Sequence, residues 1–310
     1  MSDIHGHDVK SIDEEDGVIA ECSIRLRETL ERDGFVIIPQ TLSETRLEEL
    51  RQISHHAADL ARSGKWRFVR NLPKQFPPWS EDNSEGIWGV QHLLHPDMPN
   101  HDKFATSYFN KVITTSVKAL TGVDKDEDLV MELYNLLIRP DSDFTLRWHR
   151  DDIASSATAE EELERLNKPA WHAQWNLALY NDSSLMVVPK SHTRARTEVE
   201  IHAGLFSKPI PGQCVVGLKP GDLVFYNNNI LHRGVYNSFK ERLTLHGSIG
   251  CMSGSKERAR NVLQHGVRDW IDRCDFSRLP TEMKSRAEKM RANLKQMGCM
   301  AGEVGFAHED

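Results

Sequence analysis

The chain has 310 residues, of which 39% are hydrophobic and 27% charged, and its formal net charge is −7. This composition is typical of a soluble globular protein with a sizeable core, and the lack of a basic block argues against a nucleic-acid or membrane-surface partner. No apolar stretch is long enough to cross a membrane, and the polar, acidic start lacks a signal-peptide pattern. Five scattered cysteines without a C-x-x-C pair favour a reducing compartment, so we expect a cytoplasmic protein.

The N-terminal part of the sequence predicts helices around one short strand. Residues 1–16 are charged and poor in apolar side chains, which predicts a disordered segment. Apolar residues at helical spacing predict helices over 18–33, 44–61 and 104–120. Ser43 is a candidate cap of the second helix, and 35–38 is a β-prone run. Residues 64–101 mix aromatic residues and prolines without a period, which is typical of a functional loop or of a surface segment packed on the core.

A β-rich block follows. Strands are predicted over 129–138, 171–180, 185–188, 213–217, 223–226, 230–235 and 242–249. Many short strands separated by turn residues predict a mainly β fold with flanking helices, such as a sandwich, a jelly roll or a barrel. The acidic insert 155–168 predicts an outer helix, and 256–272 and 281–296 predict charged amphipathic helices at the C-terminal end.

The first candidate site is the sequence Trp148-His149-Arg150-Asp151. Side chains alternate along a strand, so His149 and Asp151 can present an imidazole and a carboxylate to one point, with Asp152 pointing away. This short pattern occurs often by chance, and on its own it is better explained by a core histidine and a turn carboxylate.

A second signal comes from a later strand pair. A buried run ends in three asparagines, and His232 follows on the next predicted strand. Arg242 lies beyond an Asn-Ser turn, where it shares a strand face with Thr244 and His246. His246 is an alternative to His232 as the third ligand, distant in sequence from His149. We favour His232, because Arg242 follows it by ten residues and no arginine stands at that spacing after His246. His172 and His192 are weaker candidates.

Two histidines and one carboxylate form the facial triad of non-haem iron(II) oxygenases, and this ligand set leaves open positions on one side of the metal. Those positions can take a 2-oxo acid and dioxygen together. Arg242 would supply a planar fork for the far carboxylate of the 2-oxo acid, although an isolated strand arginine is more often simply exposed. The combination of these residues is more specific than any of its parts.

The same residues belong to a wider set of motifs. Residues 32–39 (RDGFVIIP), 148–151 (WHRD), 185–192 (LMVVPKSH) and 219–242, with its KPGD, His232 and Arg242, occur in that order. They resemble the opening strand, the metal motif, the P-G-S-H motif and the final motif of the phytanoyl-CoA dioxygenase-like family of iron(II)/2-oxoglutarate oxygenases. The resemblance extends from about residue 34 to residue 249.

The resemblance implies a double-stranded β-helix, a cupin-like jelly roll, with its core at about 129–250 inside a dioxygenase domain at 17–250. It implies Fe(2+) bound by His149, Asp151 and His232, with 2-oxoglutarate and O2 as cosubstrates and Arg242 on the far carboxylate. Residues 251–310 would form a helical extension packed on the core. Two further family positions match Trp175, as a residue lining the cosubstrate, and Asn135, as a polar residue on a preceding strand. The alternatives are a packed core tryptophan and a strand-edge asparagine.

Three positions depart from the family pattern: Lys190 and Ser184 replace glycines, and Gly234 replaces a small hydroxyl residue. The departures leave the metal ligands intact, but they argue against copying the substrates of relatives, including phytanoyl-CoA.

We therefore expect hydroxylation, or another oxidation, of an unactivated C–H bond in a small metabolite, with succinate and CO2 as co-products. Trp88, Gln91, His92, Thr244 and His246 are expected around the substrate. Arg147 and Arg150 could meet an acidic substrate at the mouth of the site, although solvated charges are the commoner explanation. Two other readings stay open: a catalytically silent, cupin-like metal- or ligand-binding protein, and a structural jelly roll without metal. A homo-oligomer is possible but is not indicated by the sequence.

Overall fold

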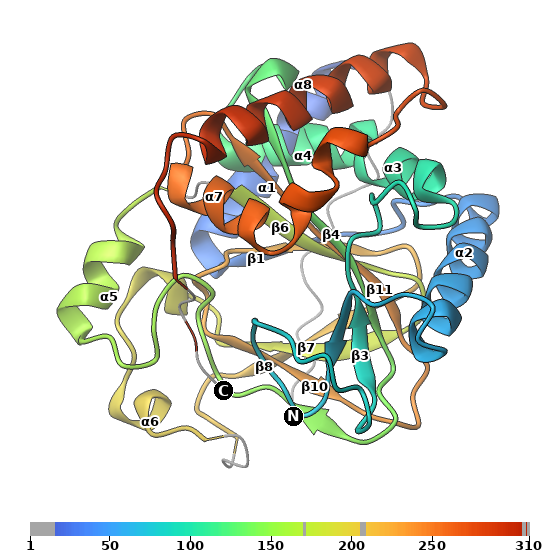
Figure 1. The fold of residues 1–310 in the computed structure, drawn as a ribbon. Coiled ribbons are helices and arrows are strands. Elements are labelled where there is room, and N and C mark those ends of the chain that lie inside the picture. Colours follow the sequence, from blue (N-terminus) through green and yellow to red (C-terminus); the bar gives the residue numbers. More distant parts are fainter. Residues whose placement is uncertain (1–15, 170–171, 205–208, 306–307, 309–310) are drawn as a thin grey trace.

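The computed structural model describes residues 16–169, 172–204, 209–305 and 308, with side chains from Ile24 onward. The predicted disordered segment, apart from Asp16, lies outside these residues, as does Trp171. Two antiparallel sheets face each other in the centre of the molecule (Figure 1).

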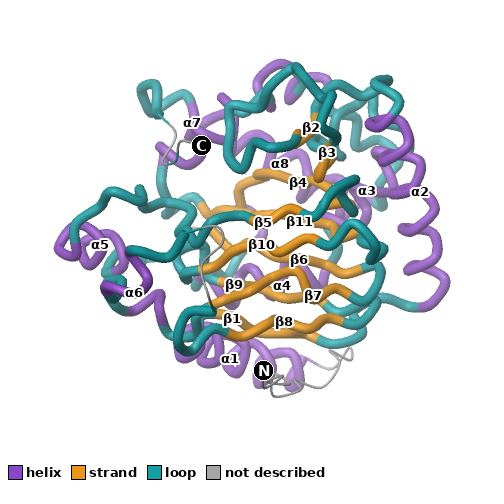
Figure 2. The backbone as a smooth tube through the Cα atoms, turned by 90° about the horizontal axis from the view of Figure 1, so that it is seen from below, coloured by secondary structure: helices purple, strands orange, loops and turns teal. Residues whose placement is uncertain are grey.

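The larger sheet has seven strands. In spatial order they are β1 (Phe35–Ile38), β9 (Leu223–Tyr226), β6 (His172–Ala178), β11 (Leu243–Cys251), β4 (Leu129–Ile138), β3 (Ile87–Val90) and β2 (Val69–Asn71). The smaller sheet has four strands, in the order β5 (Phe144–Thr145), β10 (His232–Tyr236), β7 (Asp182–Val187) and β8 (Cys214–Leu218). The non-sequential strand order shows that the chain crosses between the sheets, and Figure 2 shows the two strand layers stacked.

Helices cover the outer face of the larger sheet, on the side away from the smaller one (Figures 1 and 2). The helices of this layer are α1 (Asp16–Asp33), α2 (Glu44–Arg62), α3 (His101–Tyr108), α4 (Lys111–Thr121) and α8 (Thr281–Gly298), and α7 (Lys256–Gln264) packs against α8. The short helices α5 (Ala159–Leu166) and α6 (Glu198–Ile201) lie apart from this layer (Figure 1). Short 3-10 turns lie at Asp126–Asp128, Ser191–Thr193, Val267–Asp269 and Ile271–Arg273. The main hydrophobic core fills the space between this helical layer and the sheet. Its burial accounts for the one-sided apolar pattern of the predicted helices.

Most predicted elements are present, but the helix expected over 104–120 is two helices. Asn110 interrupts it and caps α4, because its side chain accepts a hydrogen bond of 2.9 Å from the backbone N–H of Ile113. Asparagine competes with helical hydrogen bonding in this way and favours helix starts. The cap at Ser43 is confirmed, since its hydroxyl accepts from the backbone N–H of Arg46.

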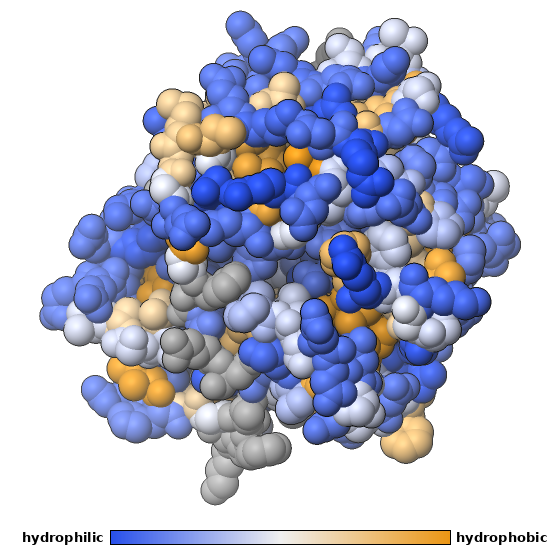
Figure 3. Space-filling model, viewed as in Figure 1, coloured by the Kyte–Doolittle hydropathy of each residue, from blue (hydrophilic) through white to orange (hydrophobic). Residues whose placement is uncertain are grey.

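The aromatic segment 64–101 contains structure that the sequence pattern did not predict. It contributes β2 and β3, which extend the larger sheet beyond β4. The outer surface on the side drawn in Figure 3 is mostly hydrophilic, with apolar residues in small separate groups. Within the part of the chain that the structure describes, no helix is both long and apolar enough to span a bilayer.

Candidate metal centre

The backbone brings the two predicted histidines side by side. His149 and His232 form an isolated antiparallel bridge, with N–H···O bonds of 3.0 Å in both directions, and their ring centroids are 4.3 Å apart. Asp151 follows in a turn rather than on a strand, and its backbone N–H donates to the carbonyl of Asn228 at 2.8 Å. The expected strand alternation from His149 to Asp151 is therefore wrong, because the chain turns at Asp151. The turn still directs the carboxylate to the histidines.

The three side chains present one donor atom each to a common point. Oδ1 of Asp151 lies 3.5 Å from Nε2 of His149 and 3.6 Å from Nε2 of His232. Candidate ligand atoms of the three residues all lie within 4.8 Å of one another. His246, the competitor for the third ligand, is not part of this cluster.

Hydrogen bonds fix which ring nitrogen of each histidine faces the common point. Nδ1 of His149 lies 2.9 Å from the carbonyl of Arg147, and Nδ1 of His232 lies 2.9 Å from the carbonyl of Ile230. A carbonyl oxygen can only accept, so each Nδ1 carries the proton and each Nε2 has a lone pair available. Metal-binding histidines are oriented by this kind of bond.

The electrostatics of the three residues suit a divalent cation. Burial lowers the pKa of His232 to about 4, so the imidazole is neutral near pH 7. Burial alone raises the pKa of the Asp151 carboxyl, but the neighbouring His232 and His149 outweigh burial and hold that pKa below its usual range. Two imidazole nitrogens and one carboxylate oxygen are a donor set that fits iron(II).

Arg242 immediately precedes β11 and lines the same cavity as the three candidate ligands. Its Nε donates to Oδ2 of Asp182 at 3.1 Å, and its guanidinium lies over the Tyr236 ring, 4.4 Å from the centroid. Thr244 donates to the same carboxylate oxygen at 2.6 Å. The Nη1 of Arg242 is buried and has no hydrogen-bond partner among the described residues. A buried donor without a partner is unfavourable, and a carboxylate of 2-oxoglutarate would satisfy it.

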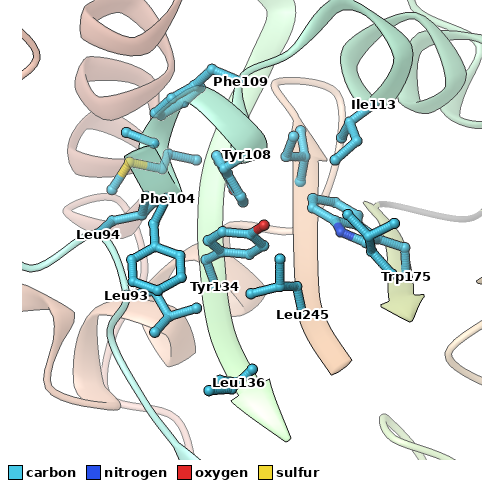
Figure 4. Packing of buried hydrophobic residues seen from close by; sticks show 14 of the residues in the cluster. Leu93, Leu94, Phe104, Tyr108, Phe109, Ile113, Tyr134, Leu136, Trp175 and Leu245 are labelled. Atoms are coloured by element: carbon cyan, nitrogen blue, oxygen red, sulfur yellow. The ribbon is translucent and has the colours of Figure 1, made fainter. Parts of the chain in front are cut away.

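Trp175 does not occupy the place predicted for it. It is fully buried on the helix side of the larger sheet, where it packs against Tyr108 and Tyr134 (Figure 4). Its ring also contacts Phe225. The prediction that it lines the cosubstrate is wrong, and the alternative of a packed core tryptophan holds. Its neighbours in sequence, Gln174 and Asn176, line the cavity instead, because adjacent strand residues point to opposite faces.

Asn135 and His246 lie opposite each other on β4 and β11. Oδ1 of Asn135 accepts from the backbone N–H of His92 at 3.0 Å, while its Nδ2 has no partner in the described structure. Asn135 is absent from the residues around the cavity, so its predicted cosubstrate role stays a prediction. His246 does line the cavity, and its Nδ1 lies 2.9 Å from Oδ1 of Asn176.

The cavity around these residues has a volume of about 470 Å³. It is walled by residues from both sheets, from the aromatic segment and from the C-terminal extension, among them Arg70, Trp79, Trp88, Gln91, Leu137, Leu146, Tyr226, Tyr236, Arg258, Asn261, His265 and His308. The extension therefore contributes to the cavity wall as well as packing on the core. A cavity of this size is suited to a small organic ligand.

Some residues expected at the cavity lie elsewhere. Trp88, Gln91 and His246 line it, but His92 and Thr244 do not. Neither arginine expected at the mouth of the site lies there: Arg150 is buried and donates to backbone carbonyls, and Arg147 is absent from the cavity wall. Asp152 was expected to point away from the site, but it lines the cavity and pairs with Arg165 at 2.7 Å.

The three departures from the family pattern have structural explanations. Lys190 adopts φ +64°, the left-handed region that favours glycine. Ser184 donates from its hydroxyl and its backbone N–H to Oδ1 of Asp182, which in turn holds Arg242. At Gly234 an added Cβ would lie 2.3 Å from the Tyr236 hydroxyl. The Tyr236 ring therefore occupies the space into which a side chain at position 234 would point.

Sequence reasoning missed four residues of the site: Gln174, Asp182, Tyr236 and Arg70. Gln174 and Trp175 are adjacent on one strand, so their side chains point to opposite faces of the sheet. Knowing which face of this strand meets the cavity would have identified Gln174. Asp182 lay in a predicted turn, and Arg70 lay in a segment without periodicity, so neither carried a signal.

No family model and no curated protein matches the sequence. Solved structures do match the fold. EctD from S. alaskensis, solved with 2-oxoglutarate and 5-hydroxyectoine, matches with a TM-score of 0.54 at 16% identity, over 74% of this chain and 77% of that chain. AviO1 from Streptomyces viridochromogenes matches with a TM-score of 0.53 at 17% identity, over 74% of this chain and 95% of that chain. SnoN is a non-haem, alpha-ketoglutarate-dependent epimerase from nogalamycin biosynthesis. Its structure with Fe3+, alpha-ketoglutarate and a nogalamycin compound matches with a TM-score of 0.51 at 18% identity, over 76% of this chain and 85% of that chain.

At these identities the likeness establishes the fold. The predicted mainly β jelly roll with flanking helices is confirmed, and it is the fold of solved enzymes that bind iron and 2-oxoglutarate. In this chain, the same fold brings His149, Asp151 and His232 together in the wall of a cavity.

Proposed function

We propose that this chain is an Fe(II)- and 2-oxoglutarate-dependent oxygenase that acts on a small organic metabolite. The observation that carries the proposal is the meeting of three candidate ligand atoms, with Oδ1 of Asp151 at 3.5 and 3.6 Å from the Nε2 atoms of His149 and His232. The same cavity is lined by Arg242, whose buried Nη1 has no hydrogen-bond partner among the described residues. A structural jelly roll without metal would need neither arrangement, and a silent metal-binding module would not need Arg242.

Each residue has a separate task in this proposal. His149, Asp151 and His232 hold iron(II) and leave one side of it open. Arg242, held in place by Asp182, binds the far carboxylate of 2-oxoglutarate. When bound, iron(II) and 2-oxoglutarate supply the oxidation of a C–H bond by dioxygen, with succinate and CO2 as co-products. The cavity walls position the target carbon and exclude water from the site.

Small-molecule metabolism in the cytoplasm is the setting that we infer for this activity. The cavity volume of about 470 Å³ supports a small substrate. The scattered cysteines support a reducing compartment.

Anaerobic titration with iron(II) and 2-oxoglutarate tests the proposal. We expect a weak visible charge-transfer band that His149→Ala and Asp151→Ala abolish and that His202→Ala, at an exposed histidine outside the site, leaves intact. A succinate-release assay across acyl-CoAs, amino-acid derivatives, small lipids and polyketide-like compounds would then identify the substrate class. Absence of the band in the wild-type chain, or its persistence in Asp151→Ala, would contradict the proposal. A band without succinate release from any compound would favour the silent binding protein.

A further inference from the structure

Arg70 is built into the cavity wall on the side of the aromatic segment. It lies on β2 opposite Gly89 of β3, and a Cβ added at Gly89 would come within 3.0 Å of the Arg70 Cδ. The missing side chain at Gly89 therefore leaves room for the Arg70 stem to lie flat across β3. The guanidinium lies 5.1 Å from the ring centroid of Trp88 and 5.6 Å from that of Trp79. These contacts hold the charged group at the cavity in one orientation.

Arg70 differs from the other arginines of the cavity wall in having no carboxylate partner within the described part of the chain. Arg165 pairs with Asp152, Arg242 with Asp182, and Arg258 with Glu132. Arg70 makes no ion pair or hydrogen bond with any residue that the structure describes, and its Nε is buried without a partner.

A guanidinium keeps its charge at any pH at which the protein is folded, so it cannot relieve this situation by losing a proton. Arg70 is half-buried, and burial lowers its pKa although the more distant Asp151 carboxylate acts in the opposite direction. A charge held in this way is stabilised when a ligand anion enters and satisfies its donors.

The cosubstrate already has a carboxylate partner in Arg242, and Asp151 is committed to the metal. We propose that Arg70 binds an oxyanion of the primary substrate, which makes the substrate a small carboxylic acid or phosphate ester. This inference rests on the proposed oxygenase function. Leu137, Leu146 and Trp88 line the cavity near Arg70, so the body of the substrate next to the anion is apolar.

The test uses the full-length protein loaded with iron(II) and 2-oxoglutarate without oxygen, and three fluorinated probes observed by fluorine NMR. The probes are para-fluorophenylacetate, para-fluorophenyl phosphate and the neutral para-fluorophenylacetamide. We expect at least one of the two anions to bind about tenfold or more tightly than the amide, as a desolvated charge pair requires. Line broadening by the iron would show that the bound probe lies in the cavity.

Three variants make the result specific. Arg70→Met removes the charge but keeps an apolar stem over the tryptophans, and it should abolish the preference for the anion. Arg70→Lys should keep part of it, because an ammonium is a cation without the planar fork. Arg67→Met, at an exposed arginine on the same segment, removes one positive charge and should change nothing. The 2-oxoglutarate titration should be the same in all of them.

Equal binding of the acid, the phosphate and the amide to the wild-type chain would overturn the inference, as would an anion preference that survives in Arg70→Met. A loss of 2-oxoglutarate affinity in Arg70→Met would assign Arg70 to the cosubstrate and overturn it as well. A wild-type chain without the charge-transfer band would instead contradict the proposed function on which the inference rests, whereas a normal band without an anion preference contradicts only the inference.

Discussion

Gln174 donates a hydrogen bond of 2.7 Å from its Nε2 to Oδ2 of Asp151. This bond determines which carboxylate oxygen is engaged by the protein and which is turned to the histidines. Because Oδ2 is held from β6, Oδ1 is left 3.5 and 3.6 Å from the two imidazole nitrogens. The metal centre thus depends on a residue of the opposite, larger sheet that is not itself a ligand.

We predict that Gln174→Leu weakens iron(II) binding by about 10- to 100-fold, because residues that orient a ligand typically have effects of that size. Isothermal titration with iron(II) under anaerobic conditions measures it. Binding of 2-oxoglutarate at saturating iron should persist, since Arg242 is untouched. Gln52→Leu, at an exposed glutamine of α2, is the control. Unchanged iron affinity in Gln174→Leu would show that Asp151 does not need this bond.

Asp182 orients the arginine that we assign to the cosubstrate. Burial by itself raises the pKa of the Asp182 carboxyl, but Arg242 and the hydroxyls of Ser184 and Thr244 outweigh burial and hold the pKa below its usual range. Asp182→Asn should therefore lower the affinity for 2-oxoglutarate and reduce the free energy of unfolding by about 3 kcal/mol, the size expected when a buried ion pair loses one partner.

Iron affinity in Asp182→Asn should stay at the wild-type value, and urea denaturation followed by circular dichroism gives the stability. Ser184→Ala is the milder comparison, with an expected loss of about 1 kcal/mol for one hydrogen bond. If iron and 2-oxoglutarate affinities fall together in Asp182→Asn, Asp182 supports the whole cavity rather than Arg242 alone.

Gly234 leaves space for the Tyr236 ring beneath Arg242. An added methyl group at position 234 would lie 2.3 Å from the Tyr236 hydroxyl and 2.5 Å from the ring carbon that bears it. Gly234→Ala should therefore displace the ring, reduce stability by about 1–3 kcal/mol as in other overpacked sites, and weaken 2-oxoglutarate binding.

The matched control for this prediction is Gly217→Ala on β8, where an added Cβ meets no atom within 4 Å. That change should raise stability slightly, because alanine restricts the unfolded chain more than glycine does. Thermal unfolding and a 2-oxoglutarate titration of both variants provide the comparison. Equal stability of the two variants would mean that Tyr236 moves away without a penalty.

Buried His92 makes the fold sensitive to acid. Burial lowers the pKa of His92 to about 3, so the folded chain keeps this ring neutral at pH values where the unfolded chain protonates it. The stability contributed by neutral His92 is complete above the ordinary histidine pKa of about 6.5 and is lost as the pH falls toward 3, by up to about 1.4 kcal/mol per pH unit.

The wild-type chain should lose stability between pH 7 and about pH 5, and His92→Asn should make that loss smaller by about 2 kcal/mol. This value is about 1.4 kcal/mol per pH unit over the roughly one and a half pH units between 6.5 and 5. Asparagine suits this position because His92 has φ +64°, and asparagine tolerates that region. Urea denaturation at the two pH values measures the effect. His202→Asn, at an exposed histidine, should leave the pH dependence as in the wild type. A variant with the wild-type pH dependence would contradict the prediction.

Much of the fold was predictable because local patterns are repeated in the final structure. The predicted strands at 223–226 and 35–38 are uninterrupted apolar runs, and the one at 129–138 is mostly apolar. In the structure β9 (Leu223–Tyr226), β1 (Phe35–Ile38) and β4 (Leu129–Ile138) cover the same residues. The helix over 104–120 was mispredicted because one capping asparagine outweighed a continuous apolar pattern. β2 and β3 carry too few residues for a pattern, so only pairing with β4 makes them strands.

For the site, the sequence by itself determined the residue types and their order: His149, Asp151, His232 and Arg242 stood out as a set. Only the tertiary structure decided the orientation of each strand toward the cavity, which turned Trp175 into the core and Gln174 toward Asp151. It also decided the partners that come from distant segments, such as Asp182 for Arg242, and it placed Arg70 where no described residue pairs with it. The physical reason is that alternation along a strand shows which residues share a face, whereas the packing of whole layers selects the face that encloses the cavity.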